Sequence, residues 1–296
     1  MPLNGNSSTR SMRINDRRGL NMKLALCTIS YRHHLRSFND LIDFASEEHF
    51  DAIDIWGVHA EHLRTEEVDR LKSSHLNVSM LSHYLNLNAP MSELLAETKR
   101  LSRLATRIGT ERIRIFAGNE ASHTLSDAKW DQLVYRLKGI CRVLDPAGQR
   151  LLLEFHPNTA TDTVEATVRL LQAINHPACR INFDVLHVIE SKADPVEAYF
   201  RLASYVDHLH LKTVANVEQF SVFEPANVYA ASGSREGMVP LFEGIVDYHR
   251  FFEDVSAHLD HLTASLEWFG PDPDERLRED RTLITQALER VPVLSR

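Results

Sequence analysis

The chain has 296 residues, of which 43% are apolar and 25% are charged, and this balance is typical of a soluble globular protein rather than a disordered one. The formal net charge of −8 argues against broad binding to nucleic acid, whose phosphates need a clustered basic surface. No segment approaches the ~18 to 20 consecutive apolar residues of a membrane span. We therefore expect a cytoplasmic protein that acts on a small molecule, with no nucleic-acid or membrane partner, and a homo-oligomer is left open.

The first 21 residues differ in character from the rest of the chain. They contain four arginines among Ser, Asn and Gly, and no apolar stretch that could form the core of an export signal. We interpret residues 1–21 as a disordered tail and residues 22–296 as one folded domain. The three cysteines are too few and too far apart for a disulfide framework or a CxxC metal site, so they are interpreted as reduced core thiols.

Short apolar or β-branched runs alternate along the chain with longer stretches of helical period, which is the pattern of a parallel sheet covered by helices. The runs predicted as strands are Lys23–Ser30, Ala52–Gly57, Val78–Leu87, Arg112–Gly118, Leu151–Pro157, Arg180–His187, Val206–Val214 and Thr263–Gly270. The predicted helices are Asn39–Glu48, Glu66–Leu76, Ser92–Ile108, Asp127–Leu144, Thr163–Ile174, Pro195–Tyr205, Tyr248–Leu259 and Asp274–Arg290. Because open doubly wound sheets usually have about five or six strands, these βα units predict a single closed (β/α)8 TIM barrel.

One connection between a strand and its helix is much longer than the others. Residues 215–247, between the seventh strand and its helix, form a segment far longer than an ordinary βα loop, and such loops are commonly functional. This one is rich in bulky side chains, including Phe220, Phe223 and Tyr229. We predict an ordered loop that acts as a lid.

Polar side chains stand where several strands end, and in barrels of this class the chemistry lies at that C-terminal face. Side chains two residues apart in a strand point to the same side, so pairs such as Glu154 and His156 can both face the barrel interior. The candidates are Glu154 and His156 in LLLEFHP, Asp184 and His187 in INFDVLH, His208, His210 and Lys212 in HLHLK, and Glu267 in SLEWFG.

Three converging carboxylates predict a metal site. Any one of them alone could be a salt-bridged structural residue, but together they would repel unless a cation neutralised them, and His210 adds a nitrogen donor beside them. We therefore predict one divalent metal ion bound by four ligands. Such a ligand set suits Mn or Mg, although Co or Zn could occupy the same site. The predicted ligands are Glu154, Asp184, His210 and Glu267.

Other polar residues near the strand ends leave their roles open. Arg114 in the fourth strand needs an anionic partner, which could be a substrate carboxylate or a neighbouring Glu. Tyr84, near the end of the third strand, could reach the pocket or belong to the core. His33 and His34 follow the first strand, and one of them could line the pocket.

The strand ends and several longer segments resemble a known family. The Glu, Asp, His, Glu pattern is similar to the xylose-isomerase-like barrels, which include sugar isomerases, epimerases and endonuclease IV. A closer resemblance is to the 3-dehydroshikimate dehydratases of the petrobactin siderophore pathway, and it runs from about Met22 to the last helix. The segments that carry it are LALCTISYRHHLRSFNDL, LLLEFHPNTATDT, INFDVLHVIESKADPVE, VFEPANVYAASGSREGMVPLFEGIV and ASLEWFG.

The resemblance implies a role for each candidate residue. It implies metal ligation by the four residues named above and catalysis by His156 and Lys212 beside them. The substrate-binding candidates, to which we add His187 at the end of the sixth predicted strand, are Arg114, Tyr84, His187, Phe223 and Tyr229. In one departure, this chain has His83 where the family has Asp before the third-strand Tyr, which puts substrate orientation there in doubt.

The resemblance further implies a metal-dependent hydro-lyase that converts 3-dehydroshikimate to 3,4-dihydroxybenzoate (protocatechuate) and water. The elimination would pass through an enolate, with His156 moving the proton and the metal acting as a Lewis acid. Either Lys212 or Arg114 would bind the substrate carboxylate. The alternative is a sugar or hydroxy-acid isomerase or epimerase of the same superfamily, which shares the metal ligands but lacks the leaving group. The product could serve siderophore assembly or the catabolism of quinate and shikimate.

Overall fold

Eight parallel strands close into a barrel in the computed structural model, which describes residues 22–291. Strands that are consecutive in the chain are neighbours in the barrel, and β8 closes on β1 in a register that pairs Leu24 with Ala264. The strands are β1 (Lys23–Cys27), β2 (Ala52–Trp56), β3 (Asn77–Ser82), β4 (Arg112–Ile115), β5 (Arg150–Glu154), β6 (Cys179–Asp184), β7 (Val206–Leu211) and β8 (Thr263–Leu266). The prediction of a (β/α)8 barrel is confirmed, while the tail predicted at residues 1–21 lies outside the described residues.

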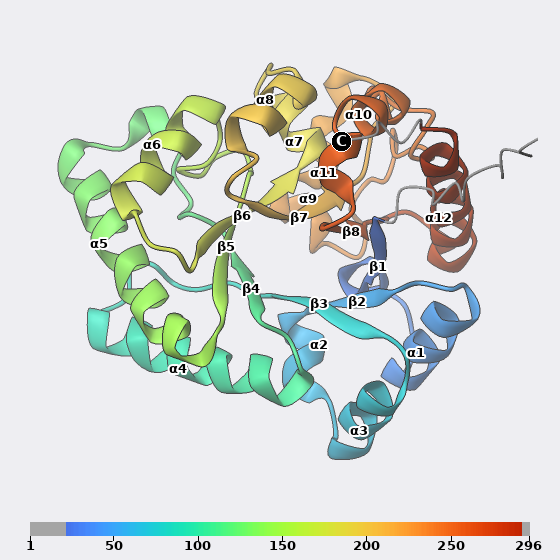
Figure 1. Ribbon diagram of the computed structural model, residues 1–296, viewed down its shortest axis with the longest axis horizontal. Coiled ribbons are helices and arrows are strands. Elements are labelled where there is room, and N and C mark those ends of the chain that lie inside the picture. The colour runs from blue at the N-terminus through green and yellow to red at the C-terminus, as the bar shows by residue number, and fades with distance from the viewer. Residues whose placement is uncertain (1–21, 292–296) are drawn as a thin grey trace, which may run out of the picture.

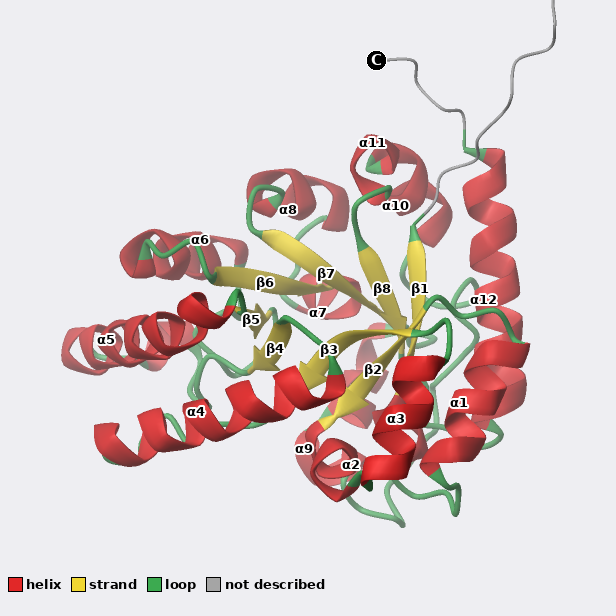
Figure 2. Ribbon diagram, turned by 60° about the horizontal axis from the view of Figure 1, so that its bottom comes forward, coloured by secondary structure: helices red, strands yellow, loops and turns green. Residues whose placement is uncertain are grey.

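Helices surround this barrel, as Figures 1 and 2 show. They are α1 (Phe38–Glu47), α2 (Gly57–His62), α3 (Thr65–Ser73), α4 (Met91–Ile108), α5 (Asp127–Leu144), α6 (Val164–Ile174), α7 (Val185–Glu190), α8 (Pro195–Leu202), α9 (Pro225–Val228), α10 (Tyr248–Asp254), α11 (Ser256–Leu259) and α12 (Pro273–Arg290). Among the described residues, none of these helices combines the length and the apolar character needed to cross a membrane.

Local sequence signals explain where several helices begin and end. Ser37 and Asp40 form a capping box at the start of α1, which satisfies backbone N–H groups that have no partner within the helix. Helix α8 begins with Pro195 directly after Asp194, whose carboxylate accepts from two backbone N–H groups. Helix α4 ends at Gly109, which has a φ of 85°, a conformation that glycine adopts without steric cost.

The core lies between the strands and the helices that cover them. Phe183 of β6 is fully buried and stacks on Phe251 of α10 with ring centroids 6.3 Å apart, and Tyr199 of α8 packs edge-on against it. Each such large apolar side chain contributes roughly 1.5 to 3 kcal/mol by leaving water. This packing holds β6, which carries part of the polar site, in a fixed position.

The predicted strands were too long at their C-terminal ends. The strand predicted at Arg180–His187 stops at Asp184, and His187 lies in helix α7 instead. The cause is local, because Asp184 caps α7: its Oδ1 accepts from the backbone N–H groups of Leu186 and His187 at 3.1 and 3.3 Å. The side chain that ends the strand therefore also starts the next helix.

The long segment at residues 215–247 is folded over the C-terminal mouth of the barrel. It contains the 3-10 helix η4 (Val217–Phe223) and helix α9, and an isolated antiparallel bridge between Val214 and Met238 fastens it to the end of β7. Arg32, which follows β1, donates to the carbonyl of Val228 at 2.7 Å. An ordered loop lies here, and its opening and closing as a lid stays a prediction.

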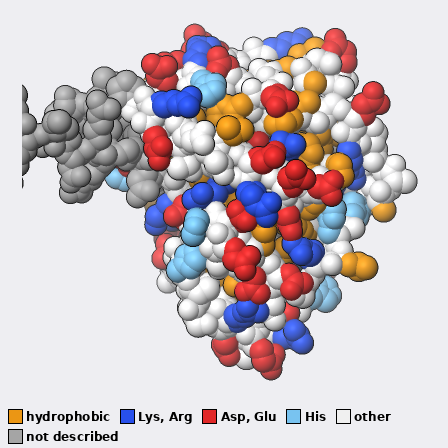
Figure 3. Space-filling model, turned by 90° about the vertical axis from the view of Figure 1, so that its right-hand side faces the viewer, with side chains coloured by type: hydrophobic (Ala, Val, Ile, Leu, Met, Phe, Trp, Pro, Cys, Tyr) orange, Lys and Arg blue, Asp and Glu red, His pale blue; other side chains and the backbone are white. Residues whose placement is uncertain are grey.

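The outer face seen in Figure 3 carries basic and acidic side chains that are interspersed rather than separated into fields. Ion pairs also join surface segments that are far apart in the chain, such as Arg278 of α12 with Glu48 at 2.7 Å. A face of this kind offers no continuous basic surface of the sort that phosphate backbones require.

Candidate metal centre and active site

The strand register brings the predicted metal ligands together. Asp184 of β6 pairs with His210 of β7, and His210 pairs in turn with Ser265 of β8. Glu154 ends β5, and Glu267 directly follows β8, where its N–H donates to the carbonyl of Leu211. All four side chains are at least nine-tenths buried, so they form one polar cluster at the mouth of the barrel.

The Nδ1 atom of His210 lies at the centre of this cluster. It is 3.5 Å from Glu154 Oε1, 3.3 Å from Glu267 Oε1 and 4.0 Å from Asp184 Oδ2. Ligand atoms at ~2.1 Å from one octahedral ion lie roughly 3.0 Å apart when adjacent and 4.2 Å apart when opposite, so these separations fit a shared ion. Ligand atoms of Glu154, Asp184 and His210 all lie within 4.8 Å of one another.

One unsatisfied buried atom supports the same conclusion. His210 Nδ1 is buried and has no hydrogen-bond partner among the described residues, although it faces the carboxylates of Glu154, Asp184 and Glu267. Buried polar atoms are rarely left in this state unless a water or an ion completes them. The donor set therefore fits a divalent cation.

Two cations of the chain lie among the same carboxylates. The Nζ atom of Lys212 is 2.6 Å from Asp184 Oδ2 and 2.8 Å from Glu267 Oε2. Arg114 Nε is 2.9 Å from Glu154 Oε2, and both side chains are 3% exposed. The anionic partner that Arg114 required is therefore a neighbouring Glu, although its buried Nη1 has no hydrogen-bond partner among the described residues.

These charges shift the pKa values of the cluster. Burial alone would raise the pKa of Glu154, but Arg114 and His210 outweigh it and hold that pKa well below its usual range. Burial is likewise outweighed at Glu267, whose pKa is lowered to about 2 by Lys212 and His210. At His210, burial would lower the pKa, but Glu267 and other carboxylates raise it to about 10. The carboxylates of Glu154 and Glu267 are therefore ionised at neutral pH and available to a cation.

His156 stands beside this cluster in a defined orientation. Its Nδ1 donates to the carbonyl of Pro157 at 2.8 Å, which leaves Nε2 as the unprotonated nitrogen. Its ring lies between Phe116 and His187, with centroids 4.4 Å from each. Burial, and then the nearby His187, lower the pKa of His156 to about 3, so the imidazole is neutral at neutral pH.

The long loop closes the cavity above these groups. Phe223 packs edge-on against Phe269 at 5.5 Å and against His187 at 6.3 Å, and the hydroxyl of Tyr229 donates to that of Tyr84. The cavity that remains is about 40 Å³, which is room for roughly three water molecules. All five predicted substrate-binding residues line it: Arg114, Tyr84, His187, Phe223 and Tyr229.

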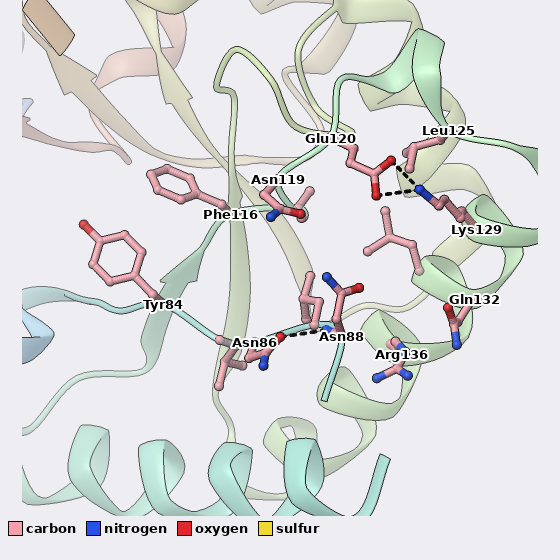
Figure 4. A pocket seen from close by; sticks show the side chains of 15 residues that line it. Tyr84, Asn86, Asn88, Phe116, Asn119, Glu120, Leu125, Lys129, Gln132 and Arg136 are labelled. Atoms are coloured by element: carbon pink, nitrogen blue, oxygen red, sulfur yellow. Dashed lines mark hydrogen bonds and ion pairs between the residues drawn. The ribbon is translucent and has the colours of Figure 1, made fainter. Parts of the chain in front are cut away.

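A second cavity of about 300 Å³ lies next to the first, and Figure 4 shows it from close by. Tyr84 and Phe116 line both cavities. The charged groups of the second cavity include Glu120 and Lys129, which pair with each other at 2.6 Å. The two aromatic rings therefore stand between the smaller cavity and this larger one.

Comparison with known proteins places the chain in a family. The model of the xylose isomerase-like TIM barrel family matches residues 42–287. The chain belongs to this family. In TIM barrels the active site lies at the C-terminal face of the barrel. The polar cluster of this chain lies at that face.

Individual relatives narrow the comparison. A 3-dehydroshikimate dehydratase from Bacillus anthracis is 41% identical over 89% of this chain and 97% of its own length. A crystal structure of the "probable 3-DHS dehydratase" involved in petrobactin synthesis in Bacillus anthracis has a TM-score of 0.85 and 41% identity, covering 89% of this chain and 99% of that one. The IOLI protein, solved with a bound zinc atom, has a similar fold: its TM-score is 0.73 at 14% identity, and the match covers 92% of this chain and all of that one.

The structure also shows site residues that sequence reasoning missed. Asp54 of β2 is fully buried and lies 3.1 Å from the Nε2 atom of His210, and Glu190 of α7 lies 2.8 Å from His187 Nδ1. Asp54 gave the same signal as Glu267, a lone carboxylate in an apolar strand. His33 and His34 do not line the closed cavity; His33 instead contacts the carbonyl of Val228 at 3.2 Å.

Proposed function

We propose that the protein is a metal-dependent 3-dehydroshikimate dehydratase that releases 3,4-dihydroxybenzoate and water. The observation that carries this proposal is the site itself, in which a neutral His156 stands beside the cluster of Glu154, Asp184, His210 and Glu267. The chain is also 41% identical to a 3-dehydroshikimate dehydratase. We assign the product to siderophore assembly, because the similar crystal structure is of a petrobactin-synthesis protein.

We assign the metal to Glu154, Asp184, His210 and Glu267, with Mn or Mg as the ion. Carboxylate-rich ligation favours these hard cations, although the IOLI protein was solved with zinc. When bound, the cation supplies Lewis-acid stabilisation of negative charge that develops on substrate oxygens.

His156 is the group that moves the proton. Its Nδ1–H is held by the carbonyl of Pro157 at 2.8 Å, so Nε2 is free to take a proton from the ring carbon next to the ketone. The same nitrogen returns that proton to the departing hydroxyl, which leaves as water. The resulting dienone tautomerises to the aromatic product. The rings of Phe116 and His187 on either side of His156 keep it aligned between these two transfers.

Arg114 and Lys212 interact with different negatively charged groups of the substrate. Arg114 has a buried Nη1 without a hydrogen-bond partner among the described residues, and its guanidinium lies over the Phe116 ring at 5.0 Å. We assign it the substrate carboxylate, which a guanidinium binds with two parallel hydrogen bonds. Lys212 is already engaged by Asp184 and Glu267, so we assign it to stabilising the anion that forms beside the metal ligands.

The long loop excludes water from this chemistry. A substituted six-membered ring needs more than the cavity of about 40 Å³, so the substrate enters only when the loop moves away from the mouth. Contacts of Tyr229 with Tyr84 and of Phe223 with Phe269 re-form over the bound ring. Closure of this kind protects a carbanion-like species from protonation by solvent.

The proposal is tested by incubating the purified protein with 3-dehydroshikimate and MnCl₂ and following the ultraviolet absorbance of 3,4-dihydroxybenzoate. We expect turnover with Mn or Mg, loss of turnover in EDTA, and recovery when the metal is restored. A matched assay with ketoses covers the isomerase or epimerase alternative. Absence of product from 3-dehydroshikimate in the metal-loaded protein would refute the proposal, and interconversion of a ketose would establish the alternative.

A further inference from the structure

His210 makes a second contact on the side of its ring that faces away from the predicted metal. Its Nε2 lies 3.1 Å from Oδ2 of Asp54, a fully buried residue of β2. The other oxygen of Asp54, Oδ1, accepts a hydrogen bond of 2.8 Å from the hydroxyl of Ser82 on β3. Asp54 therefore links three strands in a chain that runs from Ser82 through Asp54 to His210.

This chain defines which nitrogen of His210 keeps its proton when a metal displaces the other proton. A carboxylate can only accept hydrogen bonds, and Asp54 directs one oxygen to the hydroxyl of Ser82 and the other to Nε2 of His210. The Nε2 atom of His210 must therefore be the donor. The Nδ1 atom, which faces Glu154, Glu267 and Asp184, is then the nitrogen left for a metal.

We propose that Asp54 is a positioning residue that holds His210 as the Nε2–H tautomer and so presents Nδ1 to the metal. The proposal rests on the assignment of His210 as a ligand in the proposed function. Asp54 does not line the closed cavity, so it acts through His210 rather than on the substrate. Metal-bound histidines commonly donate their other N–H to a carboxylate, and this partner fixes the orientation of the ring.

A competing interpretation is a second ion on the Asp54 side of the imidazole. The Sγ atom of Cys27 lies 3.5 Å from Asp54 Oδ2 and 3.5 Å from Glu267 Oε1, so Cys27, Asp54 and His210 could surround an ion. The Cys27 thiol donates toward both carboxylates, whereas metals bind the thiolate form, which has no proton to donate. An ion at this position would also displace the proton on His210 Nε2 and so remove its hydrogen bond to Asp54. The geometry favours a hydrogen-bonded Asp54.

The test compares Asp54→Asn with a matched control, Asp207→Asn, in the full-length protein. Asp207 lies on β7 three residues before His210, but it pairs with Arg112 and Arg150 at the opposite end of the barrel. Affinity for Mn²⁺ is measured from the electron paramagnetic resonance signal of free Mn²⁺. We expect Asp54→Asn to weaken binding by about 10- to 100-fold and Asp207→Asn to leave it unchanged. Wild-type affinity in Asp54→Asn would overturn the proposal.

A second measurement needs no variant and so does not depend on folding of Asp54→Asn. In the Zn²⁺-loaded wild-type protein, ¹⁵N chemical shifts of the histidine rings report which nitrogen of His210 is protonated. We expect a proton on Nε2 and one bound ion per chain. A proton on Nδ1, or a second bound ion, would overturn the assignment to Asp54.

The outcomes separate this proposal from the proposed function. If the wild-type protein binds no divalent ion and forms no product, the proposed function fails and the role of Asp54 fails with it. If the wild-type protein binds one ion and is active, and Asp54→Asn binds equally well, only the role of Asp54 fails.

Discussion

Replacing Arg114 with Met would test whether the buried charges at the barrel mouth are arranged around a cation. Arg114 and Glu154 form an ion pair of 2.9 Å, and both side chains are 3% exposed. Removing one partner of a buried pair costs roughly 3 to 5 kcal/mol, because the other charge is left buried and uncompensated. In EDTA we therefore expect Arg114→Met to lose about that much free energy of unfolding.

A divalent ion should reduce this loss, because it would neutralise the same carboxylate. If removal of the competing guanidinium tightens metal binding tenfold, the free energy of unfolding recovers by about 1.4 kcal/mol in saturating metal. Metal binding and the Arg114 ion pair are coupled in this way only if Glu154 is a ligand. The predicted sign is thus a smaller penalty in MnCl₂ than in EDTA.

The assay is urea unfolding followed by circular dichroism, with EDTA and with saturating MnCl₂. Arg112→Met is the control, since Arg112 lies on the same strand but pairs with Asp207 at 3.1 Å at the opposite end of the barrel. Asp207 keeps Arg150 at 2.7 Å, so the control should lose only about 1 kcal/mol and should not respond to metal. An equal penalty for Arg114→Met in both solutions would refute the reasoning.

Three further changes test separate parts of the site and fold. His156→Gln should lower kcat by about 10²- to 10⁴-fold at unchanged metal content, whereas loss of metal on dialysis would place His156 among the ligands. Tyr229→Phe removes the hydroxyl that contacts Tyr84. It should raise KM by about 2- to 10-fold with little change in kcat. An unchanged KM in steady-state kinetics would contradict closure of the loop over the substrate. Burial raises the pKa of Asp280 from 3.8 to about 6, so its ionisation destabilises the fold as pH rises through this window. Asp280→Asn should therefore be more stable than wild type by about 2 to 3 kcal/mol above pH 6 and should gain no stability near pH 3.5. The Asn side chain keeps an oxygen that accepts from the N–H of Leu241. Equal denaturation midpoints for the two proteins at pH 7.5 would count against this prediction.

The barrel could be predicted from the sequence because each strand is a short apolar run and each helix has its own period and caps. The prediction was weakest where tertiary contacts decide the end of an element. Asp184 is an example. It caps α7, so β6 ends there, although the apolar sequence pattern continues beyond it. The helix predicted at Tyr248–Leu259 is likewise divided into α10 and α11 at Val255, a break that the periodicity did not signal.

Most of the site could be predicted because its residues follow strands, and all strand ends of a parallel barrel meet at one face. The sequence therefore determined that Glu154, Asp184, His210 and Glu267 would converge. Their partners could not be predicted, because pairing depends on side-chain reach across strands far apart in the chain. Only the structure shows that Arg114 pairs with Glu154 and that Lys212 bridges Asp184 and Glu267.

The sequence by itself determined the fold class, the convergence of the four predicted ligands and the long loop, since hydrophobic period and strand-end position are local properties. The tertiary structure decided the orientation of each group. The contact between His210 and Asp54 spans 156 residues, and the loop covers the mouth through contacts of Tyr229 with Tyr84. Such contacts arise only when the barrel closes, because closure is what brings β2 opposite β7 and places the long loop above them both.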